Sequence, residues 1–283
     1  IKNVDVSWMV RAMVGKSQEG IRIEKSDKLI GEEVLRVEHL SLPSEAGGYT
    51  LEDVSFSLSR GEILGIYGLL GAGRTELLEC LMGVRSEAQG EIYIKQSKTR
   101  FDKINQQIRK GLFLVPEDRK DSGLIHSLSV GKNLTIASLK KFAKAGYLSK
   151  RKESAAADKT IRELSIKVAD KGLPIYSLSG GNQQKVVIGK GILTNPSILL
   201  LDEPTRGIDV GAKEEVFKLV YEISNKGCGI ILVASELGEI TRISDRIIVL
   251  SSGKITGEFS SDICCDETLV KASEANLKTQ KVC

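Results

Sequence analysis

Four apolar segments after residue 60 alternate with stretches long enough to form helices, and this alternation constrains the fold more than any other feature. The segments read GEILGIYG, GLFLVPE, SILLLDEP and GIILVAS, at residues 61–68, 111–117, 197–204 and 229–235. Strands that are apolar on both faces are typical of parallel sheets covered by helices on both sides. The sequence therefore predicts an α/β fold with a mostly parallel sheet as its core.

Two earlier segments show a different pattern. Residues 34–42 and 51–58 alternate apolar and polar side chains, as strands with one buried face do. Two consecutive glycines, Gly47 and Gly48, lie between them and favour a turn. We expect these segments to form a small antiparallel β layer beside the parallel core.

The stretch between the second and third apolar segments holds no strong strand pattern. Residues 134–139 and 151–168 have helical character, which predicts a helical subdomain over about 118–180. Residues 246–259 read as a hairpin. The sequence thus predicts one main domain over 33–259.

The ends of the chain differ from this domain. Residues 1–18 form a short amphipathic piece without a core of its own, and a polar linker follows it. We assign 1–32 to the end of a preceding unit plus this linker, with a packing arm as the alternative for 1–18. Because the chain begins at Ile1 rather than methionine, we expect a fragment or a processed product. Residues 260–283 form a polar tail with one short helix at 267–272.

Composition excludes several classes of protein. Apolar residues make up 41% and charged residues 28%, the balance of a soluble globular protein with a full core. The net charge of +4 is too small to argue for nucleic-acid binding. Five cysteines without a CxxC pair favour a reducing cytosolic setting over disulfides or zinc. No apolar run reaches the roughly 18 residues of a membrane span.

A glycine-rich loop follows the first apolar segment and precedes a helix. Its eight residues are Gly68, Leu69, Leu70, Gly71, Ala72, Gly73, Arg74 and Thr75. Glycines at a strand–helix turn let backbone N–H groups converge on phosphate oxygens, and a Thr hydroxyl is a ligand for Mg²⁺. Arg74 stands where such loops carry lysine, and its planar fork is bulkier than an ammonium group. Taken alone, the loop is also compatible with an ordinary tight turn.

Two acids end the third apolar segment. Asp202 and Glu203 follow its four apolar residues, and ligands bind at this end of the strands in open α/β sheets. Asp202 has the chemistry to hold Mg²⁺, and Glu203 has the chemistry to orient or deprotonate an attacking water. The alternative, an acidic turn without function, loses weight because the glycine loop lies upstream.

The octet LSGGNQQK at 178–185 is the most specific motif of the chain. Ser179 can cap a helix that begins at Gly180, which leaves free N–H groups directed at an anion. The alternative is a capped helix without a ligand.

With these motifs the chain resembles the ATP-binding-cassette family over about 34–259, because LSGGNQQK is followed by ILLLDEPTRGID. GLLGAGRTELL, PEDRKDSGL and DEPTRGIDVGAK are similar to the second, C-terminal cassette of sugar-importer ATPases that carry two cassettes in one chain. MVRAMVGK, within residues 1–18, resembles the end of their first cassette. The resemblance implies a P-loop NTPase (RecA-like) fold.

The resemblance also implies a mechanism. Two cassettes pack head to tail, and each ATP lies between the glycine loop of one and the signature octet of the other. In this chain Gly68 to Thr75 would bind ATP, Thr75, Glu117 and Asp202 would hold Mg²⁺, and Glu203 would be catalytic. Ser179, Gly180, Gly181 and Gln183 would complete the partner's site.

The resemblance implies partners and a location as well. The partners would be the first cassette of the same chain, integral membrane permease subunits and, indirectly, a solute-binding protein, without nucleic acid. The protein would lie in the cytoplasm, peripheral on the inner face of the membrane, and energise import of a monosaccharide-like solute. Leu124, Ile125, Leu128 and Val130 would contact the permease or simply pack the helical subdomain.

Three departures from the family pattern fall on one site. Arg74 replaces lysine, Glu117 replaces glutamine, and Glu236 stands at the switch position where a histidine is usual. A carboxylate donates no hydrogen bond to a γ-phosphate unless it is protonated. The hypothesis is that this glycine loop forms a weak or inactive ATPase site while the octet serves the first cassette. Tyr49 is a poorly spaced candidate for stacking on adenine.

Two other classes of protein fit this sequence less well. A translation factor with two cassettes would need a longer and more basic linker than residues 16–31. A chromosome-organising ATPase would need a long coiled coil in place of the roughly one hundred residues between loop and octet. A non-catalytic regulatory cassette stays open, as does an importer of nucleosides or of a sugar-derived signal.

Overall fold

The computed structural model describes residues 30–99, 101, 103–144, 146–261 and 266–275. The assignment of 1–32 to a preceding unit therefore falls almost entirely outside the described residues.

The core is a six-stranded sheet with the strand order β12-β11-β3-β10-β9-β6. Its strands are β3 (Ile63–Gly68), β6 (Leu112–Val115), β9 (Ile198–Asp202), β10 (Gly229–Val233), β11 (Arg246–Ser251) and β12 (Lys254–Ser260). The first five run parallel, and β12 pairs antiparallel with β11 at the edge. The predicted parallel core and the predicted hairpin are both confirmed.

A second, antiparallel sheet has the order β2-β1-β4-β5. It contains β1 (Glu33–Pro43), β2 (Tyr49–Ser59), β4 (Gln89–Ile94) and β5 (Ser97–Thr99). The sequence predicted β1 and β2 only. It missed β4 and β5 because they are short and bury only two side chains, Ile92 and Ile94, against β1.

Successive side chains along each strand of the parallel sheet point alternately into two hydrophobic layers, one on each face of the sheet. Leu64 and Leu200 point to the side of the antiparallel sheet and α2 (Arg74–Met82). Leu199 and Leu201 point to the opposite side, where they meet helices. The helices of that side are α6 (Gly180–Leu193) and α7 (Val210–Asn225). Strands buried on both faces need this double cover, since each face exposes apolar surface that must be removed from water.

Three further helices flank the core. They are α3 (Ile104–Lys110), α8 (Leu237–Ile243) and α9 (Asp266–Glu274). Helix α9 is longer than the tail helix that we expected at 267–272. Its Leu269 is fully buried against β11.

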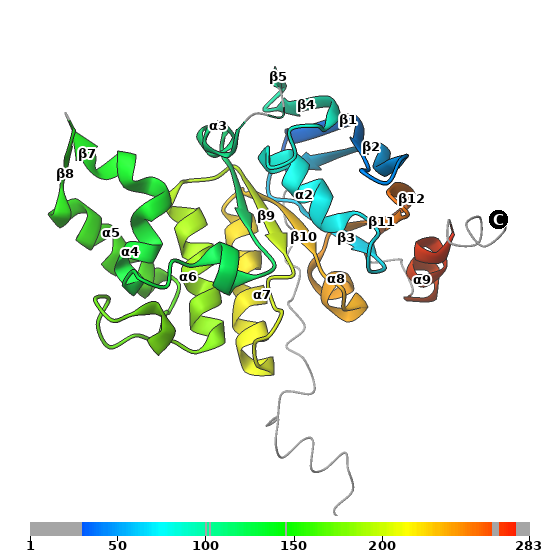
Figure 1. Ribbon diagram of the computed structural model, residues 1–283. Coiled ribbons are helices and arrows are strands. Elements are labelled where there is room, and N and C mark those ends of the chain that lie inside the picture. The colour runs from blue at the N-terminus through cyan, green and yellow to red at the C-terminus, as the bar shows by residue number, and fades with distance from the viewer. Residues whose placement is uncertain (1–29, 100, 102, 145, 262–265, 276–283) are drawn as a thin grey trace, which may run out of the picture.

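A helical region lies to one side of the core, where Figure 1 shows it in green. Its elements are η1 (Arg119–Gly123), α4 (Val130–Thr135), η2 (Ile136–Phe142), α5 (Lys150–Glu163) and η3 (Ile175–Ser177), with the short hairpin β7 (Ala143–Lys144) and β8 (Tyr147–Leu148). The predicted helix at 134–139 is thus divided between α4 and η2, and the helix predicted over 151–168 ends at Glu163.

The side chains proposed for a permease contact divide into two groups. Leu124 and Val130 are buried in the core of the helical region, so they pack that region rather than line a surface. Ile125 is exposed and Leu128 is half-buried. Among the helices of the described residues, we find none that combines the length and the apolar character of a membrane span.

Candidate functional site

A cavity of about 510 Å³ lies at the carboxyl ends of β3, β9 and β10. Because these parallel strands are neighbours, their following loops meet at one edge of the sheet. The lining residues are Leu70, Gly71, Ala72, Gly73, Arg74, Thr75, Glu76, Glu117, Asp202, Glu203, Arg206 and Ser235. The structure thus brings together residues 70–75 of the glycine loop, both acids of the β9 end, and Glu117, whereas Gly68 and Leu69 are not among the lining residues.

The glycine loop connects β3 to α2 in a conformation that needs its glycines. Gly71 and Gly73 have φ values of 79° and 97°, and a Cβ on Gly73 would lie 2.7 Å from Leu51 Cδ2. A Cβ on Gly68 would lie 2.5 Å from the carbonyl oxygen of Leu250. The loop therefore delivers the N-terminus of α2 to the cavity, where unpaired N–H groups and the helix dipole attract an anion.

Arg74 extends across the cavity to the end of β10. Its Nη1 donates a hydrogen bond to the carbonyl oxygen of Ala234 at 3.0 Å and lies 3.5 Å from Oε1 of Glu203. Only 11% of either charged side chain is exposed. In this conformation the arginine that replaces the usual lysine is held by protein acceptors that would compete with a phosphate.

Asp202 is buried, with 2% exposure, and its environment suits a metal ion. Burial raises its pKa to about 6, against a hydrogen bond from Thr75 and the charge of Arg74, which lower it. Its Oδ1 has no hydrogen-bond partner within the described part of the chain. A buried acceptor without a donor is costly, and a hard cation beside it would relieve that cost.

The donor set around Asp202 fits Mg²⁺ with a bound phosphate. Thr75 and Glu117 line the same cavity and carry further oxygen atoms of the kind that bind Mg²⁺. No cluster of three or more His, Cys, Asp or Glu side chains suited to a metal occurs in the described residues. Mg²⁺ commonly binds to one or two carboxylates and completes its coordination with substrate phosphates and water, so the set present is sufficient.

Glu203 has a strained backbone. Its φ of +45° is unusual for a residue with a side chain, and such strain concentrates at functional positions. The backbone N–H of Glu203 donates to the carbonyl oxygen of Val233 at 2.9 Å. Its Oε2 accepts a hydrogen bond from Ser235 at 3.2 Å. The carboxylate is therefore fixed at the cavity wall by β10 and by Arg74.

Glu117 is held by an ion pair within the cavity. Its carboxylate binds the guanidinium of Arg206, which follows β9 in the chain. A metal ion at Glu117 would have to compete with this guanidinium. The sequence did not predict Arg206, because the contact joins residues of two separate loops.

Ser235, rather than Glu236, reaches the cavity. The Glu236 side chain is 66% exposed and pairs with Lys213 at 2.8 Å, outside the lining residues. The sequence interpretation placed the switch position one residue too late, since only the register of β10 shows which side chain faces Glu203. Ser235 carries a hydroxyl, which both donates and accepts.

The signature octet lies apart from this cavity. Ser179 precedes α6, but its hydroxyl forms no capping bond to that helix among the described residues and instead accepts from Asn182 Nδ2 at 3.0 Å. The expectation of a hydroxyl cap is thus wrong, although the helix begins at the predicted Gly180. A Cβ on Gly181 would lie 2.4 Å from Ala212 Cβ, so α6 packs closely on α7. The amide of Gln183 donates to the Leu178 carbonyl at 3.1 Å.

Tyr49 is half exposed at the start of β2 and is absent from the residues that line the cavity.

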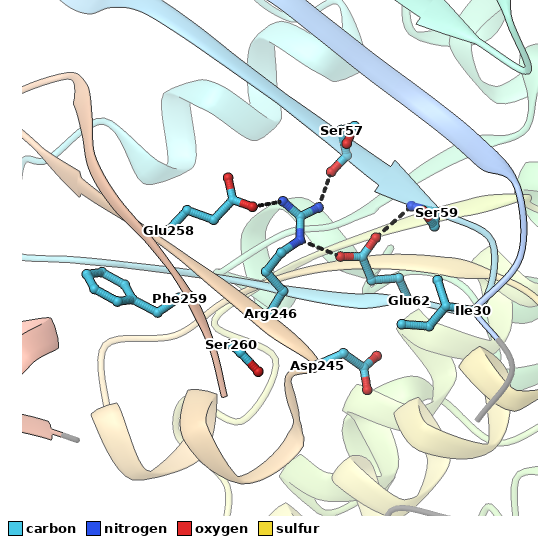
Figure 2. A pocket seen from close by; sticks show the side chains of 9 residues that line it. All are labelled: Ile30, Ser57, Ser59, Glu62, Asp245, Arg246, Glu258, Phe259 and Ser260. Carbon is cyan, nitrogen blue, oxygen red and sulfur yellow. Dashed lines mark hydrogen bonds and ion pairs between the residues drawn. The ribbon is translucent and has the colours of Figure 1, made fainter. Parts of the chain in front are cut away.

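A second cavity, of about 620 Å³, lies at the opposite edge of the sheet, where β3 and β11 begin. Figure 2 shows Arg246 at its centre, paired with Glu62 and Glu258, each at 2.8 Å. Glu62 in turn accepts from the backbone of Ser59 at 2.7 Å. These charges satisfy one another, so we interpret this network as structural.

A phosphate-binding glycine loop facing an acidic strand end defines a nucleotide-binding cassette of the P-loop NTPase fold. A family model described as ABC transporter matches residues 51–206, more than half of the chain. The protein belongs to this family.

Known proteins agree with this assignment. A dimeric ATP-binding cassette in a post-hydrolysis state, bound to ADP and phosphate, superimposes with a TM-score of 0.70. At 22% identity, over 80% of this chain and 98% of that one, it supports the fold alone.

Two curated relatives are closer in sequence. The xylose import ATP-binding protein of Photobacterium profundum is 42% identical over 95% of this chain and 54% of its own length. The ribose import ATP-binding protein of Geobacillus kaustophilus is 42% identical over 96% of this chain and 54% of its own length. The chain thus spans about half the length of these relatives.

Proposed function

We propose that this chain is one cassette of the ATP-binding component of an ABC importer, which couples ATP binding and hydrolysis to uptake of a monosaccharide or related solute. The observation that carries the proposal is the cavity in which Asp202 and Glu203 face the glycine loop. The xylose and ribose import relatives support the class of solute.

The residues of the chain divide the work in the cavity. The N–H groups of Gly71 to Thr75 bind the phosphate chain, with Arg74 adding positive charge. Asp202, Thr75 and Glu117 would hold Mg²⁺, which would neutralise phosphate charge when bound. Glu203 accepts the proton of the attacking water, and Ser235 fixes the orientation of that carboxylate by its hydrogen bond.

The exposed start of α6 supports a contact with a nucleotide that another cassette holds. Ser179 is exposed, and its helix N-terminus is available to a nucleotide held by another cassette. We infer that this second cassette precedes the present one in a longer chain, as the length of the relatives supports. Permease subunits and a solute-binding protein complete the system, with the cassettes on the cytoplasmic face of the membrane.

A regulatory cassette that binds ATP without hydrolysing it is the second candidate. It is favoured by the pairing of Arg74 with Glu203 and of Glu117 with Arg206, which occupies two groups that catalysis would need. A weak site of this kind would leave hydrolysis to the partner cassette.

Nucleotide binding and hydrolysis by the isolated chain separate these candidates. A fluorescent ATP analogue should bind with Mg²⁺, and turnover should be measurable at high protein concentration. Glu203→Gln should keep binding and lose about a hundredfold or more in turnover, because it removes the general base. Glu222→Gln, an exposed change on α7, is the matched control.

Each outcome decides between the two. Binding without turnover in the unchanged chain supports the regulatory cassette, and absence of binding contradicts both. Uptake of labelled xylose, ribose and galactose by cells that carry the complete transporter tests the class of solute.

A further inference from the structure

Arg119 connects the start of the helical region to the loop that follows Glu203. It is the first residue of η1, directly after the segment that carries Glu117. Its Nη1 donates to the carbonyl oxygen of Arg206 at 2.7 Å, and its Nη2 donates to that of Gly207 at 2.9 Å. One planar guanidinium therefore binds two consecutive carbonyls, a geometry that an ammonium group does not reproduce.

The same guanidinium lies against the start of α6. A Cβ built on Gly180 would lie 2.8 Å from Nη2 of Arg119, so the glycine leaves the room that the arginine occupies. The backbone turn that contains Arg119 is also fixed, because the Asp118 carboxylate accepts hydrogen bonds from the backbone N–H groups of Lys120 and Asp121 at 2.8 and 3.1 Å. The arginine thus lies between the loop after β9 and the signature helix.

The loop that Arg119 holds is continuous with Glu203. The backbone N–H of Arg206 donates to the carbonyl oxygen of Glu203 at 3.0 Å, closing the turn that keeps Glu203 at positive φ. One of the two residues between them, Thr205, is buried and donates to Glu239 Oε2 at 2.6 Å. A shift of the carbonyls at 206 and 207 would therefore alter the backbone that orients the Glu203 carboxylate.

We propose that Arg119 is a positioning residue that clamps the loop at 204–209 and thereby sets the orientation of Glu203 according to the position of the helical region. It rests on the proposed function, because it assigns Glu203 to ATP hydrolysis. A displacement of η1 or of the α6 start, such as a partner would cause, is transmitted to Glu203 through two hydrogen bonds.

Hydrogen–deuterium exchange of the peptide at 204–209 tests the clamp without nucleotide. Arg119→Lys keeps the charge but loses the two-point geometry, and we expect exchange of this peptide to accelerate about tenfold. Lys120→Ala removes a charge from an exposed side chain of the same turn and should leave exchange unchanged.

Turnover measured on the same variants tests the consequence for Glu203. Arg119→Lys should lower kcat about tenfold with an unchanged KM for ATP, since the phosphate-binding loop is intact. The proposal is overturned if Arg119→Lys exchanges like the unchanged chain, if Lys120→Ala changes as much, or if KM changes instead of kcat. If the unchanged chain shows no turnover, the assignment of Glu203 to hydrolysis by this chain fails, while the exchange result still decides whether Arg119 clamps the loop.

Discussion

The buried carboxylate of Asp202 makes the stability of the nucleotide-free chain depend on pH. Burial raises its pKa to about 6 from the ordinary value of 3.8. Between these values the folded chain keeps a proton that the unfolded chain has released. The free energy of unfolding is therefore highest at low pH as far as Asp202 determines it. It falls as the pH rises from about 4 to about 6 and is constant above that.

Asp202→Asn removes the cost of burying a charged carboxylate while preserving the shape of the side chain. We expect the variant to exceed the unchanged chain in free energy of unfolding at pH 7 by on the order of 3 kcal/mol. Urea unfolding without Mg²⁺ at pH 4 and pH 7 measures the difference, which should nearly vanish at pH 4. Equal stability of the two chains at both pH values would show that Asp202 is not destabilised by its burial.

The same carboxylate predicts how metal-dependent nucleotide binding changes with pH. Below about pH 6 the protonated form of Asp202 predominates, and a metal must displace the proton. We expect the affinity for Mg²⁺-ATP to fall up to about tenfold per pH unit below 6, while binding measured in EDTA changes much less. A fluorescent ATP analogue titrated from pH 5 to 8 measures this. Asp202→Asn, the control, should lose the difference between Mg²⁺ and EDTA.

At the scale of helices and strands, two glycines in helices have opposite surroundings. Gly191 of α6 faces Phe113 of β6, and a Cβ there would lie 2.6 Å from the ring. Gly238 of α8 has no described atom within 4 Å of the same position, apart from its helix and chain neighbours. The first glycine permits close packing of α6 on the sheet, and the second has no such role.

Alanine at these two positions should therefore act in opposite directions. Gly191→Ala should destabilise the chain by about 1–3 kcal/mol, because the aromatic ring has to shift in a packed core. Gly238→Ala should stabilise it by up to about 1 kcal/mol through helix propensity. Urea unfolding of both variants measures the effects, and a stabilising Gly191→Ala would contradict the close packing.

Local patterns predicted most elements, because the signal lay within a few neighbouring residues. The glycine loop and the acids after β9 were located from strand, turn and helix patterns alone. The pairs Glu117–Arg206 and Arg74–Glu203 were not, since each joins loops far apart in the chain. Ser235 was missed for a related reason, because the register of β10 decides which side chain faces the cavity.

At the scale of the whole molecule, the candidate nucleotide cavity and the signature octet lie apart. The cavity lies at the carboxyl edge of the parallel sheet, whereas Ser179 lies exposed at the start of α6 and lines no part of that cavity. Figure 1 shows α6 between the core and the helical region. Under the proposed function, the cavity and the signature octet would each meet its complement on a second cassette.

In the two-cassette protein of the proposed function, this arrangement predicts unequal effects of damage to the cavity and to the octet. If the cavity of this chain is the weaker site, Ser179→Arg should lower ATP hydrolysis and transport far more than Glu203→Gln does. The exposed position of Ser179 tolerates a long side chain, and an added cation there would obstruct a nucleotide held by the partner without unfolding α6.

Ser86→Arg, also at an exposed serine, is the matched control and should leave both activities unchanged. Steady-state hydrolysis and solute uptake in vesicles measure the effects. A transporter that Glu203→Gln inactivates and Ser179→Arg leaves working would show the reverse division of labour. In that case Arg74 must leave Glu203 when nucleotide binds, and the glycine loop of this chain would form the productive site.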